Sequence, residues 1–390
     1  MKVLHILTDT NIGGAGSCAL TLAKYLNRPG KCEIEVILPE NSALRPDFEK
    51  IGVNVTEARW IADRSFHPRA VIRLMRLISE KNPDVVHTHA VLSGRVAARL
   101  RGKCRIVYTR HSVFDVPEKN KRFPRKQLIG FVNNFFSDAI IAVSPAAKEN
   151  LTGMGTDPNK IHIIMNGAEP VPVMTDAERA AVRRGYGLDG NDFVVSMIAR
   201  LVPVKGQDVL LDAAKILAAS PPGIKCGNPS DGKKLKFLFA GEGPAEAALR
   251  EKIAVEKISG VIFAGFVSDV AKIFNITDLQ ANASCGTDAT SVSLLQGMSL
   301  GIPAVASEFG GNPYVIRDGV NGLLFPVKDA RALAGSIRRL CLDKALYAKT
   351  AQNARRIYAE EFTAEAMAER TFALYAQLVP YGRETSQKKH

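Results

Sequence analysis

The sequence predicts an α/β protein of two domains, each built around a doubly wound parallel sheet. Short apolar runs alternate with amphipathic segments through residues 3–143, and the same alternation restarts at residue 193. Strands that alternate with helices in this way form parallel sheets with crossover helices. The 390 residues also exceed the size of one ordinary domain. Two such sheets facing each other across a central cleft would suit two substrates or a ligand of two parts.

In the first half, buried apolar runs predict strands and helical apolar spacing predicts helices. A glycine turn at 13–16 follows the first strand, and Val71, Leu74 and Ile78 share one face of a later helix. The predicted strands are 3–7, 33–38, 84–87, 105–109 and 139–143, and the predicted helices are 17–26, 70–81 and 93–100.

The second half repeats the pattern after a proline-containing linker at 166–176. A stretch rich in Pro, Gly, Asn and Asp at 220–234 predicts a surface loop. The predicted strands are 193–198, 235–240, 261–264, 279–283 and 304–306, and the predicted helices are 207–219, 244–257, 292–300, 329–340 and 366–380.

Composition narrows the classes of partner and the compartment. A net charge of +13 favours anionic partners such as nucleotide phosphates or phospholipid surfaces, although a basic surface with no partner stays open. Nucleic acid is not expected, because zinc-finger spacing, basic heptads and RNP-like aromatic strings are missing from the sequence. The six cysteines form no C-x-x-C pair, and no stretch approaches a membrane span. We therefore expect a cytoplasmic protein that meets a membrane only at its surface.

The segment ARLVPVKGQD, residues 199–208, is the first candidate binding site. It joins a predicted strand to a predicted helix, where backbone N–H groups and the positive helix end favour an anion. Arg200 and Lys205, five residues apart, could clamp a diphosphate, and Gly206 permits close approach. An ordinary turn flanked by a solvated Arg and Lys is the alternative.

A second candidate spans residues 282–316. Asp288 precedes a predicted helix, and Gln296 lies eight residues further on. Carboxylate and amide groups at these positions can bond sugar hydroxyls. Gly310, Gly311 and Asn312 follow the next strand, and the N–H groups of such a loop can wrap a phosphate or a sugar. The alternative is a capped buried helix followed by a turn.

The first half offers glycines and histidines near predicted strand ends. Gly14 and Gly16 lie in GGAG, which lacks the G-x-G-x-x-G spacing and is therefore a weak nicotinamide signal but a reasonable close-approach loop. His87 and His89 point the same way from one strand, and His111 ends another at the rim of the expected cleft. The chain has no D-x-D, so cations and helix N-termini, and no metal, are expected to neutralise a leaving diphosphate.

In order along the chain, these segments resemble glycosyltransferase family 4, which has the GT-B architecture of two Rossmann-like domains. The resemblance covers nearly all of the chain. It implies an acceptor-side domain of residues 1–168 with a C-terminal helix at about 364–390, and a donor-binding domain of residues 169–363. The segments that carry it are the glycine loop at 13–16, VVHTHA at 85–90, DAIIAVSPAAKENL at 138–151, KIHIIMNGAE at 160–169, ARLVPVKG at 199–206, FAGEGP at 239–244 and residues 285–316.

The resemblance also implies roles by position. Arg200 and Lys205 are similar to the clamp on the donor diphosphate, and His111 to the histidine that contacts the donor sugar near the reacting face. Asp288 and Gln296 stand where the family usually has two glutamates, the first on the donor sugar and the second on the nucleotide ribose. These two departures could alter sugar preference or weaken activity.

Two glycine segments complete the implied site. Gly310, Gly311 and Asn312 resemble the loop that contacts the donor sugar and phosphates. Gly14 and Gly16 resemble the loop that lines the diphosphate and the acceptor side.

The activity implied is retaining transfer of a sugar from a nucleotide-diphosphate donor, expected to be UDP-linked, without a metal or other cofactor. The acceptor would be a glycan or a lipid-linked molecule in cell-envelope polysaccharide or glycolipid synthesis. Its hydroxyl would attack from the leaving-group face with a phosphate oxygen as base; double displacement lacks a convincing nucleophile.

The basic segment EKNKRFPRKQ, residues 118–127, is expected to touch a lipid-linked acceptor or an anionic membrane surface, or else to be a solvated loop. Three alternative functions stay open: a sugar-nucleotide 2-epimerase, a catalytically weak GT-B binding module and a nicotinamide oxidoreductase.

Overall fold

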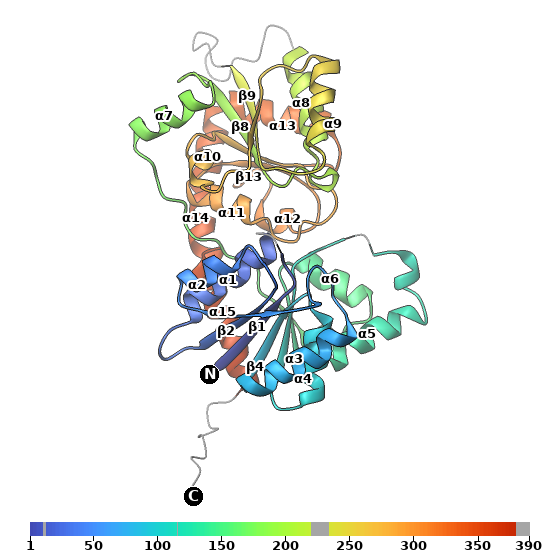
Figure 1. Cartoon of the computed structure of the whole chain (residues 1–390). Coiled ribbons are helices and arrows are strands. Elements are labelled where there is room, and N and C mark those ends of the chain that lie inside the picture. Colours follow the sequence, from blue (N-terminus) through green and yellow to red (C-terminus); the bar gives the residue numbers. More distant parts are fainter. Residues whose placement is uncertain (11–12, 115, 220–233, 380–390) are drawn as a thin grey trace, which may run out of the picture. The chain divides into compact units, whose positions relative to one another are not determined.

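The computed structural model describes residues 1–10, 13–114, 116–219 and 234–379 (Figure 1). The chain divides into two compact units, Met1–Gly167 with Ala364–His390 and Ala168–Thr363. The boundaries expected at 168/169 and 363/364 lie within one residue of this division.

Within the described part of the first unit, seven parallel strands form one sheet in the order β3-β2-β1-β4-β5-β6-β7. The strands are β1 (Lys2–Leu7), β2 (Glu33–Pro39), β3 (Asn54–Ala58), β4 (Val85–His89), β5 (Arg105–Arg110), β6 (Ala139–Ala142) and β7 (Ile161–Ile163). The helices are α1 (Gly14–Leu26), α2 (Arg45–Lys50), α3 (Pro68–Lys81), α4 (Leu92–Arg101), α5 (Arg125–Phe135), α6 (Pro145–Gly153) and α15 (Ala364–Leu378), with 3-10 turns at Glu118–Asn120 and Pro158–Lys160.

Successive residues of β1 supply the cores on the two faces of this sheet. Val3 and Leu7 pack with α1 and α15, whereas Leu4 and Ile6 pack with α3 and α4. Figure 1 shows α15, the last helix of the chain, beside α1 on this unit. The alternation also directs His5 toward the α1 and α15 face.

The described part of the second unit has a six-stranded parallel sheet in the order β10-β9-β8-β11-β12-β13. Its strands are β8 (Phe193–Ile198), β9 (Leu235–Ala240), β10 (Val261–Gly265), β11 (Leu279–Asn282), β12 (Ala304–Ser307) and β13 (Gly322–Phe325). Its helices are α7 (Asp176–Gly185), α8 (Gln207–Ala219), α9 (Glu246–Glu256), α10 (Ala271–Asn275), α11 (Val292–Ser299), α12 (Asn312–Val315), α13 (Ala330–Leu342) and α14 (Lys344–Glu361), with a 3-10 turn at Pro203–Lys205.

Local sequence signals explain several helix ends of this unit. Thr175 and Glu178 form a capping box at the start of α7, each side chain bonding the backbone N–H of the other residue. Asp329 and Asp343 cap α13 and α14 through their carboxylates.

The predicted α/β class, with two doubly wound parallel sheets, is confirmed. The prediction omitted the sheet-edge strands β3, β7 and β13, the 18-residue helix α14, and the shorter helices α2, α5, α6, α7, α10 and α12. The basic segment 118–127 is not wholly a loop, because it contains a 3-10 turn and the first residues of α5. The predicted surface loop at 220–234 falls almost entirely outside the described residues.

Candidate functional site

The topology of each unit identifies the edge where a ligand is expected. In the first unit β1 and β4 are neighbours, and in the second β8 and β11 are neighbours, so the strand order reverses between them. Ligands of open parallel sheets bind beyond the carboxyl ends of the strands at such a point. Most of the predicted site residues follow these strands or the next ones, β5 and β12.

An ion pair between Lys205 and Asp288 lies at the carboxyl edge of the second unit. Lys205 Nζ is 3.0 Å from Asp288 Oδ2. The same oxygen accepts hydrogen bonds from Ser284 Oγ at 2.7 Å and Asn282 Nδ2 at 3.2 Å. Burial raises the pKa of Asp288, but the charge of Lys205 and these hydrogen bonds outweigh burial and hold the pKa below its ordinary value. Asp288 is therefore an anion that holds the Lys205 ammonium in place.

Lys205 and Arg200 both lie between β8 and α8. Lys205 ends a 3-10 turn and is partly exposed, so N–H donors beyond the one used by Asp288 remain for a ligand. Arg200 is exposed, and its guanidinium makes no ion pair or hydrogen bond with any residue that the structure describes. The predicted cationic segment thus carries one fixed cation and one unengaged cation.

Glycines allow the loops of this edge to pack backbone against backbone. Gly206 has a φ of 74°, and a Cβ there would lie 2.2 Å from the carbonyl oxygen of Ala283. A Cβ on Gly311 would lie only 1.4 Å from the carbonyl oxygen of Ala289. A larger residue at either position would push these backbones apart. The two glycines therefore let the loops after β8, β11 and β12 pack together around Asp288.

Residues 310–312 form hydrogen bonds that hold this loop against the segment that carries Asp288. The N–H of Gly311 donates to the carbonyl of Asp288 at 3.2 Å, and that of Asn312 to Phe309 at 3.1 Å. The buried Asn312 side chain donates to the carbonyl of Ser307 at 3.1 Å. Both N–H groups are thus engaged within the loop, and contact of Gly310, Gly311 and Asn312 with a phosphate or sugar stays a prediction. Gly310 adopts a φ of 58°, which makes the turn possible.

Gln296 lies in α11 and is half-buried. Its carbonyl accepts a bond from Ser299, but its side-chain amide has no hydrogen-bond partner among the described residues. Contact between this amide and a nucleotide ribose stays a prediction.

The two predicted loop glycines of the first unit lie inside a helix, which corrects the prediction. α1 begins at Gly14, with Gly13 as its N-cap. A Cβ on Gly16 would lie 2.5 Å from Leu44 Cδ1, so Gly16 lets α1 pack closely on a neighbouring segment. Space around Gly14 is open, and its position in the first helical turn offers an unpaired backbone N–H to a ligand.

Three histidines form a hydrogen-bonded chain at the carboxyl edge of the first unit. His5 Nδ1 is 3.0 Å from His89 Nε2, and His89 Nδ1 is 2.7 Å from His111 Nε2. The far nitrogens, His5 Nε2 and His111 Nδ1, are buried without a partner among the described residues. His111 follows β5 directly, so the chain leads from the core to the expected ligand edge.

Burial lowers the pKa of each histidine in this chain, to about 3 for His5 and about 4 for His111, and well below the ordinary value for His89. All three rings are therefore neutral at pH 7, and each contact needs one N–H and one lone pair. The chain then has two consistent proton arrangements. In one, His111 Nδ1 carries a hydrogen; in the other, it presents a lone pair.

A fourth histidine, His87, is tied to different partners. Its Nδ1 contacts the hydroxyl of Tyr375 at 2.5 Å and its Nε2 contacts that of Thr109 at 2.6 Å. His5, His87 and His89 offer nitrogen atoms within 4.8 Å of one another, a spacing that could be considered for a metal ion. A divalent ion there would break the bonds of His87 and would place charge in a fully buried site whose electrostatic neighbours are other histidines and no carboxylate. The cluster fits a neutral hydrogen-bond network better than a metal site.

Sequence reasoning missed several groups at these edges. Ser284 and Asn282 bind Asp288, and Asp9 lies two residues after β1, where burial and then the charge of Asp63 raise its pKa. No motif marks these residues; position just after a strand is the only available signal.

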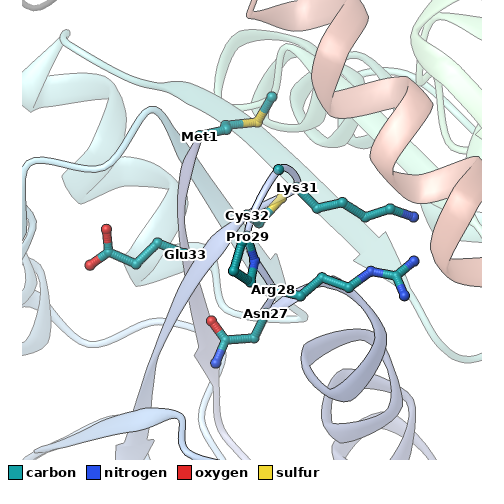
Figure 2. A pocket seen from close by; sticks show the side chains of 8 residues that line it. Met1, Asn27, Arg28, Pro29, Lys31, Cys32 and Glu33 are labelled. Carbon is teal, nitrogen blue, oxygen red and sulfur yellow. The ribbon is translucent and has the colours of Figure 1, made fainter.

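A pocket lies at the amino ends of the strands of the first sheet, away from the candidate site residues at the carboxyl ends. It is lined by residues near the start of β2, and Figure 2 shows Arg28 and Lys31 extending to one side of it. Both cations pair with Glu369 of α15, so they serve packing of that helix.

Two family models account for nearly the whole chain. One, described as Glycosyltransferase Family 4, matches residues 12–170, and the other, described as glycosyl transferases group 1, matches residues 178–357. Together they show a glycosyltransferase of the family 4 type. Its two Rossmann-like units have the GT-B fold, and the enzyme is a glycosyltransferase, as its sequence resemblance implied.

Individual relatives of this family 4-type enzyme are distant. The putative glycosyltransferase EpsD of Bacillus subtilis is 28% identical over 316 residues, covering 76% of this chain and 78% of that protein. A D-inositol 3-phosphate glycosyltransferase of Actinosynnema mirum is 28% identical over 322 residues, covering 77% and 74%. The crystal structure of Anabaena HepE in complex with UDP superposes with a TM-score of 0.80 at 22% identity, covering 97% of this chain and 100% of that one.

Proposed function

We propose that the enzyme is a retaining glycosyltransferase that moves a sugar from a UDP-linked donor to a hydroxyl of a glycan or lipid-linked acceptor in cell-envelope polysaccharide or glycolipid synthesis. The observation that carries this proposal is the anchored Lys205 beside the unengaged Arg200 at the carboxyl edge of the second unit. Two cations at a strand-to-helix segment suit a pyrophosphate, which gains negative charge as the sugar leaves.

The donor follows from the same chemistry and from relatives. HepE has been solved in complex with UDP and with UDP-glucose, and it has the same fold as this chain. In this proposal Lys205 and Arg200 bind the diphosphate without a metal, and Gln296 bonds the ribose. Asp288 acts mainly by holding Lys205, because its Oδ2 is already committed to three partners.

His111 is assigned to the reacting face of the donor sugar. Its Nδ1 is buried without a partner among the described residues, and such a nitrogen gains a hydrogen bond when a substrate oxygen approaches. The acceptor hydroxyl attacks the anomeric carbon from the side that the diphosphate leaves, and a phosphate oxygen takes its proton. The bond to the diphosphate breaks as the new glycosidic bond forms, which retains the anomeric configuration.

The test is transfer of label from a panel of radiolabelled UDP-sugars, with a membrane extract as the source of acceptor. The proposal predicts equal amounts of free UDP and labelled glycan or lipid, with the donor's anomeric configuration kept in the product. A change at C2 of the sugar while UDP stays attached would instead support the epimerase. Binding of a UDP-sugar without UDP release under any condition would support the binding module.

We further propose that the first unit touches an anionic membrane surface through residues 118–127 and α5. Phe123 is 81% exposed, and Leu128, Phe131 and Phe135 form an exposed row on α5 at intervals of three and four residues. The cations of the basic segment precede this row and continue into the first turn of α5, and apolar side chains with adjacent cations are typical of helices that bind anionic bilayers. The described residues contain no helix long and apolar enough to cross a membrane.

Vesicle flotation tests this contact. Wild-type protein is expected to float with vesicles containing phosphatidylglycerol and not with phosphatidylcholine alone. Replacing Phe123 and Phe131 by Ser should abolish flotation, whereas Leu100→Ser, which removes an exposed apolar side chain of α4, should not. Equal flotation of both variants would contradict the assignment.

A further inference from the structure

A pocket in the first unit combines an exposed aromatic ring with several arginines that lack partners. Its volume is about 490 Å³, within the size range of small-ligand sites. It lies where β2 and β3 end and α3 begins, and Trp60, Ile72, Arg69, Arg73 and Arg76 form much of its wall.

The arginines gather on one face of α3. Arg69 and Arg73 are four residues apart and Arg76 follows three later, so their charges repel one another along the helix. All three are exposed, and none forms an ion pair or hydrogen bond with a described residue. Like charges kept together without a partner indicate an anionic ligand.

The acidic groups of the pocket do not neutralise these arginines. Glu40 pairs with Arg59 at 2.7 Å, and Glu57 pairs with Arg45 at 3.1 Å. Each carboxylate already has a cation of its own, so a net positive charge stays with the face of α3.

Trp60 is held in an unusual backbone conformation. Its φ is 64°, in the left-handed region that a bulky side chain rarely adopts, and its ring is 43% exposed. One side of the ring stacks on His67, with ring centres 6.2 Å apart and planes 8° from parallel. Strain that keeps a large apolar ring in solvent points to a binding role for that ring.

Together with the proposed transferase function, on which this step rests, these observations identify the ligand class. We infer that the pocket is an acceptor subsite for a negatively charged sugar residue. Trp60 packs against the apolar face of the sugar ring, and Arg69, Arg73 and Arg76 bind its carboxylate.

The location supports a subsite distant from the reacting hydroxyl. Trp60 follows β3, and His111 follows β5, four strand positions along the same carboxyl edge. Neighbouring strands lie about 4.8 Å apart, which places the pocket roughly 20 Å from His111. An oligosaccharide of several residues can span such an interval.

Single-stranded nucleic acid is the other ligand with aromatic and cationic contacts, but the pocket suits it less. Nucleic-acid sites stack successive bases on several rings and follow the backbone along a groove. The exposed ring that lines this pocket is Trp60 alone among the described residues, and the cations converge on one depression. A DNA oligonucleotide is therefore tested beside the charged and neutral sugars, to see whether it binds more tightly than they do.

Trp60 is the one tryptophan of the chain, so its fluorescence reports on this pocket directly. The protein without donor is titrated with oligogalacturonate, with neutral maltohexaose and with a thymidine oligonucleotide. Oligogalacturonate should cause a saturable change in the emission, and its affinity should fall as the NaCl concentration rises. Maltohexaose should have little effect on the emission. No uronate response, an equal response to maltohexaose, or tighter binding of the oligonucleotide would overturn the inference.

Variants separate this site from the proposed catalytic function. Arg73→Gln combined with Arg76→Gln should weaken uronate binding at least 10-fold, whereas Arg331→Gln, an exposed arginine of α13, should leave it unchanged. Trp60→Gly relieves the backbone and should keep or raise the melting temperature while uronate binding, followed by calorimetry, falls. Because these assays need no UDP release, a failure of the transferase proposal leaves them interpretable, and a failure here leaves UDP release unaffected.

Discussion

The carboxyl edges of the two sheets differ in charge: the first carries neutral side chains and the second carries charged ones. In the first unit, His5 of β1, His89 at the end of β4 and His111 just after β5 form a chain of buried neutral histidines. In the second, the residues after β8 and β11 form the Lys205–Asp288 ion pair beside the exposed Arg200. The strand order is the same in both units except for the additional edge strand β7, so topology alone does not decide what an edge binds.

The difference follows from the groups that each edge can stabilise. An anionic ligand such as a diphosphate needs permanent cations, and the Asp288 carboxylate keeps Lys205 in place for it. A hydroxyl group needs a hydrogen-bond donor or acceptor, and a neutral imidazole with a free nitrogen supplies either one. Substitutions that remove the anchored cation or the free imidazole nitrogen should therefore impair the two edges in different ways.

Removal of Lys205 should have the largest effect. Lys205→Ala deletes the anchored cation and leaves Asp288 buried without it, so turnover should fall on the order of 10²–10³-fold. Steady-state UDP release measures the change. Lys215→Ala, which removes an exposed lysine of the next helix, is the matched control and should stay near wild type. Loss of activity in both variants would point to general destabilisation and not to a diphosphate contact.

Breaking the histidine chain should have a smaller effect. His89→Leu removes the partner of His111 Nε2, and kcat should fall roughly 10–100-fold while the affinity for UDP is unchanged. His89→Gln keeps one donor and one acceptor and should recover part of the loss. Tyr375→Phe, which affects only His87, should be near neutral for kcat. An equal loss with Gln and Leu would contradict a role for the hydrogen-bond chain.

The pH dependence of stability should show the smallest effect. His5 has a folded pKa of about 3, below the unfolded value of about 6.5, so the unfolded chain binds more protons between these values and stability falls as the pH falls. His5→Gln should reduce the slope of the unfolding free energy against pH by about 1 kcal/mol per pH unit between pH 6 and 5. Urea unfolding followed by Trp60 fluorescence, which reports on the first unit, measures both slopes. Parallel slopes would mean that His5 is not buried neutral.

The central strands could be predicted from the sequence, because burial on both faces requires nearly continuous apolar runs. Helices such as α3 and α13 could be predicted from their apolar spacing, whereas α5 and α6 were missed. β3 escaped prediction because polar residues interrupt its apolar run, and β7 because it has only three residues. α14 escaped because its buried positions include Thr350 and Ala354, which give a weak apolar signal. The sheet order itself depends on pairing between distant strands, which no local pattern records.

The candidate site could be predicted where its charged residues and a glycine lie in one short segment, as Arg200, Lys205 and Gly206 do. It was not predictable where function depends on partners from other strands. The register between β1 and β4 sets His5 opposite His87 and brings His89 within reach, and only the fold determines that register. Likewise, the attachment of Asp288 to Lys205 joins residues 83 positions apart.

In the proposed function, Arg200 and Lys205 together hold the diphosphate of a nucleotide donor in the second unit. Calorimetry of UDP and of uridine with wild type and Arg200→Ala tests it most directly, because Arg200 is exposed and its loss should not disturb the fold. UDP should bind about 10–100-fold more weakly to the variant, whereas uridine binding should be unchanged. Unchanged UDP affinity, or equal weakening of both ligands, would contradict it.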